Sequence, residues 1–322
     1  MKKLLCRVLF WFKNSRPYTI PITFLCWLVI FIYSFKQGGN LINGIIAYFG
    51  IGLLHLATNL ADDYFDYIRL SKDPRHIQGT KDSKCRYLKS GLASLGELRL
   101  VIGLMLLVSA LIGGYLFFSA GWYVIIFALI ALFIVLAYSK LSSCGFGDVA
   151  VIAAYGPLMY EGVYYVMCGR LSFSVLVLSF ACSIFVDSIL YSSMILDYDE
   201  DFNSGKMTLC TRLNSKNKAL LSLAVLYIIG FAFTCYYSVI VSNYFCLICF
   251  FVLPLIVDLM YSLDIYNKNK SILPKVHFWN YPLDNWNSIK DSTCASYFLR
   301  FFYVRNIAVL FLCLISLAIY IK

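Results

Sequence analysis

The chain has 322 residues, of which 61% are hydrophobic and only 14% charged, and its mean hydropathy is +0.77. A soluble domain has about a quarter of its residues charged, so the composition excludes a soluble globular protein and predicts a polytopic membrane protein without a nucleic-acid partner. The apolar runs are long and unbroken, which favours helices over the alternating strands of a membrane barrel.

Nine apolar runs satisfy the length of about 20 residues that a helix needs to cross the hydrocarbon core. We therefore predict an all-α fold of nine transmembrane helices in one membrane domain over residues 1–322. Residues 1–16 combine basic and aromatic side chains, which is typical of a helix lying on the membrane surface. Gly156-Pro157 interrupts the fifth run. The predicted spans are 18–35, 41–65, 98–118, 122–138, 148–167, 172–196, 218–241, 243–264 and 301–321.

The basic residues predict the orientation of these spans. With a cytoplasmic N-terminus, 24 of the 27 Lys and Arg residues fall on the cytoplasmic side, and the opposite side keeps only Lys36, Arg170 and Lys322. This asymmetry follows the positive-inside rule. It places the segments 67–97 and 197–217 in the cytoplasm, and we expect a bacterial inner-membrane protein.

Twelve cysteines are scattered through the apolar runs. The one close pair, Cys246 and Cys249, has no His or acidic neighbour. Apolar packing is therefore favoured over a metal or redox site, and we expect no disulfide.

The second span ends in acidic side chains. Asn59, Asp62, Asp63 and Asp66 close the run 41–67, and His55 precedes them by about one turn. At about 100° per residue, all five fall within a stripe roughly 100° wide on one helix face. Asn59 and Asp66 lie near the centre of this stripe, and Asp62 and Asp63 lie at its two edges.

The sixth span ends in a second acidic cluster. Asp197 and Asp201 share a helix face, Glu200 lies at its edge, and Asp199 points to the far side. Gly205, Lys206 and Arg212 follow. Asp197 and Asp201 therefore form the matched pair, and we expect Asp199 to be exposed or to cap a helix.

Carboxylates that share a helix face repel one another, so a cation is expected between them. Oxygen ligands without a Cys or His cluster suit Mg²⁺, which bridges carboxylates to phosphate oxygens. Nearby cations would meet the remaining phosphate charge; they are Lys72, Arg75, Lys84, Arg86, Lys140, Lys206 and Arg212. The plain alternative is solvated acidic helix ends beside loops that obey the positive-inside rule. Two such motifs on one predicted side favour the metal interpretation.

Both motifs resemble signatures of the UbiA-type membrane prenyltransferases. The first is Asn59-Leu-Ala-Asp-Asp63-Tyr-Phe-Asp66, and the second runs from Asp197 through Asp201 and Gly205-Lys206 to Arg212. The stretches 86–94, 145–148, 155–157 and 162–172 resemble the branch that prenylates 1,4-dihydroxy-2-naphthoate. Two departures concern the acceptor: Asp62 stands where the family often has Asn, and Ser193, Met194 and Leu196 replace residues usual in that branch.

The resemblance implies nine helices around a lipid-open cavity and Mg²⁺-dependent transfer of a prenyl group from a polyprenyl diphosphate to an aromatic acceptor. It implies metal binding by Asn59, Asp62, Asp63, Asp66, Asp197 and Asp201, with Asp63, Asp66, Asp197 and Asp201 as the catalytic carboxylates. The allyl cation formed when the diphosphate leaves would be stabilised by aromatic faces. Tyr155 is a candidate for this role, as are Tyr160, Tyr164 and Tyr165, although packing or anchoring at the membrane interface explains any one of them more simply.

Three further polar residues lie within predicted spans: His55, Glu161 and Asp187. Ionisable groups there often serve function, but a hydrogen-bonded structural role fits each as well. Two other functions stay open. A UbiA-type terpene cyclase would act on the diphosphate without an acceptor. A transporter of an anionic lipid or metabolite would need no Mg²⁺-type carboxylate pairs, and the chain shows no matched pair of broken helices.

Overall fold

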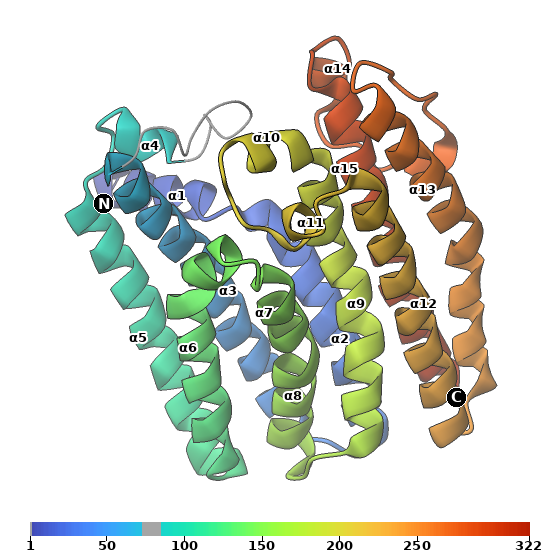
Figure 1. Cartoon of the computed structure of the whole chain (residues 1–322). Helices are drawn as coiled ribbons and strands as arrows, with labels where there is room; N and C mark the ends of the chain where they lie inside the picture. Colours follow the sequence, from blue (N-terminus) through green and yellow to red (C-terminus); the bar gives the residue numbers. More distant parts are fainter. Residues whose placement is uncertain (1, 73–84) are drawn as a thin grey trace. The chain divides into compact units, whose positions relative to one another are not determined.

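The computed structural model describes the backbone of residues 2–72 and 85–322 and the side chains of residues 5–68 and 85–322. In that part of the chain the secondary structure is helical, which confirms the predicted all-α class (Figure 1). Eight helices there are long and apolar enough to cross a membrane. The chain divides into two compact units: unit 1 holds residues 1–150 and 158–172, and unit 2 holds residues 151–157 and 173–322.

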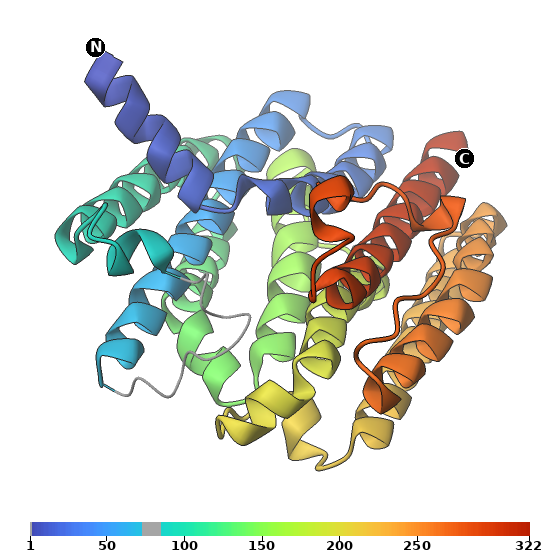
Figure 2. The same cartoon turned by 90° about the horizontal axis from the view of Figure 1, so that it is seen from above.

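Unit 1 is organised around one long helix, α3, which packs against α2, α5, α6 and α8. Figure 2 shows α1 in dark blue, running outward from the short turn η1 that connects it to α2. The elements of this unit are α1 (Lys2–Asn14), η1 (Pro17–Thr19), α2 (Ile20–Lys36), α3 (Leu41–Lys72), α4 (Arg86–Lys89), α5 (Leu95–Ala120), α6 (Tyr123–Ser143) and α8 (Met159–Cys168).

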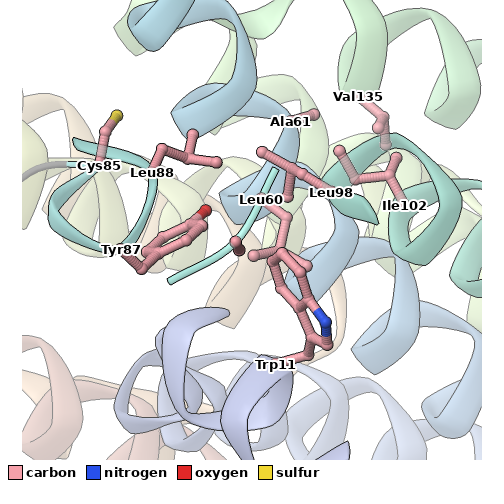
Figure 3. Packing of buried hydrophobic residues seen from close by; sticks show 10 residues of the cluster. Trp11, Leu60, Ala61, Cys85, Tyr87, Leu88, Leu98, Ile102 and Val135 are labelled. Atoms are coloured by element: carbon pink, nitrogen blue, oxygen red, sulfur yellow. The ribbon is translucent and has the colours of Figure 1, made fainter. Parts of the chain in front are cut away.

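A buried cluster fixes the polar end of α3 in unit 1. Leu60 and Ala61 precede Asp63 on α3 and pack with Trp11, Tyr87 and Leu98 (Figure 3). Each of these side chains is at most 7% exposed. Because interiors are close-packed, this cluster restricts rotation of α3 and thereby fixes the direction of its acidic face.

The predicted interruption at Gly156-Pro157 is confirmed. The segment consists of α7 (Gly147–Ala153), a π-helical turn (Ala154–Leu158) and α8, and Gly156 leaves the helical region at φ −106° and ψ −111°. A Cβ atom at Gly156 would lie 2.7 Å from Ser183 Oγ, so only glycine permits this close approach to α9. The break explains why this segment is not among the eight long helices.

Unit 2 is organised around α9, which packs against α12, α13 and α15. The rings of Phe185 on α9 and Phe311 on α15 stack with centroids 3.6 Å apart. The elements are α9 (Phe173–Leu196), α10 (Tyr198–Asn203), α11 (Leu209–Arg212), α12 (Lys216–Ile240), η5 (Tyr244–Val252), α13 (Leu253–Lys268), η6 (Phe278–Asn280), α14 (Trp286–Ile289) and α15 (Ala295–Ile321).

Several predicted helix ends were too short. The second predicted span, 41–65, continues to Lys72, so its acidic residues lie inside a helix and not at its end. The third begins at Leu95, where Ser94 and Glu97 form a capping box that satisfies the first backbone N–H groups. The eighth, 243–264, begins as a 3₁₀ stretch before α13.

All twelve cysteines are free thiols, as expected from the sequence.

Candidate active site

The first acidic motif lies on α3, and its central carboxylate is buried. Asp63 is 3% exposed. The guanidinium of Arg16 donates a hydrogen bond to Asp63 Oδ1, and its Nη1 lies 3.7 Å from Asp62 Oδ2. Burial disfavours the charged guanidinium, but attraction to Asp63 and Asp62 outweighs burial, so the pKa of Arg16 is raised above its ordinary value. Arg16 therefore remains a permanent cation beside this motif.

Tyr87 holds the other oxygen of the same carboxylate. Its hydroxyl donates to Asp63 Oδ2 at 3.2 Å, and the neighbouring Cys85 thiol donates to the Asp63 backbone carbonyl at 3.2 Å. Burial and the Asp63 charge raise the pKa of Tyr87 above its ordinary value, so the phenol stays protonated and continues to donate. Asp63 is thus fixed by one cation and one neutral donor.

Asn59 and His55 face the N-terminal turn of unit 1. The amide nitrogen of Asn59 donates to the Ser15 carbonyl at 2.9 Å and to Thr19 Oγ1 at 3.3 Å, which leaves its carboxamide oxygen available as a ligand in the described part of the chain. The two ring nitrogens of His55 lie 2.9 Å from Thr19 Oγ1 and 2.5 Å from Thr23 Oγ1. This pairing supports a structural role for His55.

Asp66 turns toward a different neighbour. Its Oδ1 accepts a long hydrogen bond of 3.5 Å from Ser139 Oγ on α6. The carboxylates of the predicted stripe therefore have different neighbours. Asp63 contacts Arg16 and Tyr87, and Asp66 contacts α6.

The second acidic motif in unit 2 lies at a break between helices. α9 ends at Leu196, and Asp197 precedes α10 with φ −89° and ψ 5°. Its carbonyl accepts the backbone N–H of Asp201 at 2.9 Å, so the two carboxylates sit one helical turn apart, as predicted. Asp201 is 1% exposed, and the Nζ of Lys206 lies 3.5 Å from its Oδ2.

Asp197 and Asp199 have different partners. The Tyr297 hydroxyl on α15 donates to Asp197 Oδ2 at 3.5 Å. Asp199 points away, as expected, and pairs with Lys216 at 2.7 Å and Lys270 at 3.1 Å. Burial opposes ionisation of Asp199, but hydrogen bonds from both lysines outweigh burial and hold its pKa below the ordinary value. Asp199 therefore stabilises the surrounding loops, and Asp197 and Asp201 remain the candidate metal ligands.

The remaining predicted substrate-binding residues differ in their exposure. Arg86, Lys140 and Arg212 are exposed, each in the last turn of a helix or on a short helix. Tyr155 lies in the π-helical turn and is half-buried. The side chain of Lys72 lies outside the described residues, as do Arg75 and Lys84.

The two remaining intramembrane acids are both buried. Glu161 on α8 accepts the backbone N–H of Ser172 at 3.1 Å, which fixes the loop that follows α8. Asp187 lies in the middle of α9 with 0% exposure. The Glu161 contact favours a structural role for that residue.

Sequence reasoning missed three residues that contact these motifs: Arg16, Tyr87 and Tyr297. They reach the acidic motifs from distant positions, and Arg16 adopts a left-handed backbone conformation at φ 59°. Asp148 is 4% exposed, and neither of its carboxylate oxygens has a hydrogen-bond partner in the described part of the chain. The motif Gly145-Phe-Gly-Asp148 was the signal that pointed to it.

The donor chemistry of both motifs suits Mg²⁺, because every candidate ligand presents oxygen. Among the described residues, no three His, Cys, Asp or Glu side chains gather around one point. Mg²⁺ is commonly held by one or two carboxylates together with water and substrate phosphate. One carboxylate pair in each unit fits that pattern.

Comparisons with known proteins place the chain among membrane enzymes. Residues 24–281 match the UbiA prenyltransferase family. The chain is similar to the 1,4-dihydroxy-2-naphthoate octaprenyltransferase of Escherichia coli (strain K12), with 24% identity over 218 residues that cover 64% of this chain and 69% of that protein.

Solved structures share the fold. A digeranylgeranylglyceryl phosphate synthase superposes with a TM-score of 0.60 at 14% identity over 100% of both chains. A UbiA homologue from Archaeoglobus fulgidus bound to GPP and Mg²⁺ superposes with a TM-score of 0.57 at 15% identity, covering 97% of this chain and 99% of that one.

Proposed function

Because the chain belongs to the UbiA prenyltransferase family, we propose that it transfers a prenyl group from a polyprenyl diphosphate to 1,4-dihydroxy-2-naphthoate. The observation that carries this proposal is a nearly buried carboxylate beside a cation in each motif. Asp63 has Arg16, and Asp201 has Lys206. Burying a carboxylate costs free energy. The presence of a buried carboxylate in each motif therefore supports a function for both in binding a cation.

We propose that Asn59 and two of the three carboxylates Asp62, Asp63 and Asp66 would hold Mg²⁺ at one motif, and Asp197 and Asp201 at the other. When bound, Mg²⁺ stabilises the negative charge of the departing diphosphate. The structural neighbour from Archaeoglobus fulgidus, which was solved with GPP and Mg²⁺, supports this assignment.

The chain's basic side chains supply the remaining charge for the diphosphate. In this proposal they stabilise the leaving group as the bond between C1 of the prenyl chain and its oxygen breaks; they are Lys72, Arg86, Lys140, Lys206 and Arg212. Tyr155 would present an aromatic face to the resulting allyl cation. The acceptor ring then attacks C1. The similarity to the Escherichia coli octaprenyltransferase supports dihydroxynaphthoate as the acceptor.

The protein is an integral membrane protein, as its apolar helices and family indicate. We propose that it lies in the bacterial inner membrane with its N-terminus and acidic motifs in the cytoplasm. The concentration of 24 of its 27 basic residues on one predicted side supports this orientation.

A single assay tests the proposal. Purified protein is incubated with a labelled prenyl diphosphate and Mg²⁺, with and without dihydroxynaphthoate, and diphosphate release and products are measured. We expect release that depends on both the acceptor and Mg²⁺. Release without acceptor, accompanied by a cyclised hydrocarbon, would instead identify a terpene cyclase. Prenyl diphosphate binding without any release would refute the enzyme assignment.

Three variants sharpen the assay. Asp63→Ala and Asp201→Ala should each lower turnover by at least about a hundredfold, because each removes a carboxylate aimed at the leaving diphosphate. Asp264→Ala is the matched control, since Asp264 pairs with Lys268 on the surface of α13 and should keep full activity. Full activity in Asp63→Ala or Asp201→Ala would disprove their assignment as metal ligands.

A further inference from the structure

Unit 2 contains a cavity of about 240 Å³ that the proposed reaction does not use, with charged and apolar side chains in its lining. It lies between α13, the loop that follows it and the first turns of α15, two helices that pack side by side (Figure 1). Its lining includes two permanent cations, Lys275 and Arg300, and one carboxylate, Asp258. None of the residues proposed to bind the diphosphate or Mg²⁺ lines it. We refer to it as the α13–α15 cavity.

Arg300 is the central charge of this cavity. It is 1% exposed. Its Nε donates to the Ser262 carbonyl at 2.8 Å, and its Nη1 donates to the Ser296 carbonyl at 2.9 Å and to Ser296 Oγ at 2.6 Å. In the described part of the chain, Arg300 forms no ion pair with a carboxylate. A buried guanidinium held only by neutral groups leaves its charge uncompensated, which is costly.

Asp258 lines the same cavity without neutralising Arg300. Its Oδ2 accepts the Tyr303 hydroxyl at 2.8 Å. With Lys275 and Arg300 positive and Asp258 negative, the permanent charges of the lining leave one positive charge in excess. A bound monoanion would balance this charge.

Ser262 provides an independent sign of a missing ligand. Its carbonyl accepts a hydrogen bond from Arg300, but its hydroxyl is buried, and no hydrogen-bond partner for it lies among the described residues. Ser262 lines the cavity. An unsatisfied buried hydroxyl costs about 1–3 kcal/mol, so such groups are uncommon in native proteins. An acceptor oxygen in the cavity would satisfy it.

The edge of the cavity is apolar. Tyr261, which lines the cavity, is 67% exposed, and Ile272 and Leu273 on the adjoining loop are 45% and 44% exposed. In a membrane protein, such side chains can cover the chains of a lipid whose head group lies deeper.

We propose that the α13–α15 cavity binds a phosphate group, either inorganic phosphate or the phosphodiester of an anionic lipid. Donors converge on it from three segments: Ser262 on α13, Lys275 on the loop and Arg300 on α15. Donors on several sides suit the tetrahedral oxygens of phosphate better than a planar carboxylate. This site goes beyond prenyl transfer and does not depend on it.

Thermal unfolding of the purified full-length protein tests the site, because a ligand that binds only the folded state raises Tm. Inorganic phosphate replaces chloride at constant ionic strength, with EDTA present. A second arm titrates short-chain phosphatidylglycerol against phosphatidylcholine with the same acyl chains. We expect a saturable rise in Tm with phosphatidylglycerol and none with phosphatidylcholine. A matching rise with inorganic phosphate means that the site takes the free ion as well, and no rise with it assigns the site to lipid.

Two variants assign the binding to this cavity. Ser262→Ala and Lys275→Gln should each weaken binding about tenfold or more, because each removes a hydrogen bond to a charged ligand. Without ligand, Ser262→Ala should not lower Tm, since it removes an unsatisfied hydroxyl. Lys290→Gln is the matched control, an exposed lysine on the same loop that does not line the cavity.

A further variant separates this cavity from the proposed diphosphate site. Lys206→Gln removes a cation beside Asp201 and should leave the titration unchanged. Loss of binding in Lys206→Gln would place the anion at the acidic motif and overturn the proposal. So would the absence of any saturable rise in Tm, or equal affinities in the wild type, Ser262→Ala and Lys275→Gln.

Discussion

Replacing Arg16 by glutamine tests the arrangement at the first acidic motif most directly. Arg16 is a cation that lies against Asp63, whose side chain is 5% exposed. Removing one partner of a buried ion pair costs about 3–5 kcal/mol. Here the Arg16 side chain is 25% exposed and Tyr87 still donates to Asp63, so we expect a loss of about 2 kcal/mol.

The measurement is thermal unfolding without divalent metal, where this loss corresponds to a fall in Tm of about 4 °C. Arg7→Gln is the matched control. Arg7 pairs with Glu97 at 2.7 Å, but these side chains are 39% and 46% exposed, so that variant should lower Tm by clearly less than Arg16→Gln. In Arg16→Gln the carboxylate loses its competing cation, so Mg²⁺ should raise Tm by more than in the wild type.

A double-mutant cycle with Asp63→Asn completes the test. If Arg16 stabilises the protein through Asp63, the double variant should be more stable than the sum of the two single losses by about 1–2 kcal/mol. Strict additivity, or an Arg16→Gln loss no larger than that of Arg7→Gln, would refute the role assigned to Arg16.

Three further predictions concern residues outside this pair. Gly156→Ala should lower Tm by an amount equivalent to about 1–3 kcal/mol, because its Cβ would meet Ser183 Oγ at 2.7 Å; an unchanged Tm would contradict the close approach of these segments. Asp148→Asn should leave Tm unchanged or raise it, because no described residue forms a hydrogen bond with the buried carboxylate; a fall in Tm would contradict this reading. Because its folded pKa is lowered, Asp199 should stabilise the protein above its unfolded pKa of about 4 and lose this effect as pH falls through its folded pKa. The Tm gap between wild type and Asp199→Asn should therefore be present at pH 7, small because the pair with Lys216 is partly exposed, and should shrink steadily as pH falls below about 4; a gap that does not change with pH would disprove the ionic mechanism.

The sequence pattern predicted the helical class, the break at Gly156-Pro157 and the spacing of the acidic residues, because each depends on local periodicity or on a backbone that Gly and Pro alter. The opposite direction of Asp199 was also predictable from helix geometry. Helix ends were less predictable, since capping at Ser94 and the polar continuation of α3 carry little hydropathy signal.

The partners of the acidic residues could not be predicted. Arg16 and Asp63 are 47 positions apart, and their contact depends on a left-handed backbone conformation at Arg16 and on how the N-terminal turn packs. The contact of Tyr297 with Asp197 spans 100 positions. Such pairs follow from tertiary packing, which a single sequence does not encode as a local pattern. The metal and substrate assignments of the individual residues stay predictions.

The length of α3 has a consequence for where the chemistry can occur. Its 32 residues span about 48 Å, whereas the hydrocarbon core is about 30 Å thick. An upright helix that enters lipid near Leu41 leaves it about 20 residues later, just before Asp62. In such an orientation, the carboxylates of α3 lie just outside the hydrocarbon core, in the region of the lipid head groups and water. Like α3, a prenyl diphosphate has an apolar part and a charged end. In the proposed reaction, its phosphates would therefore reach these carboxylates while its apolar tail stays in the lipid.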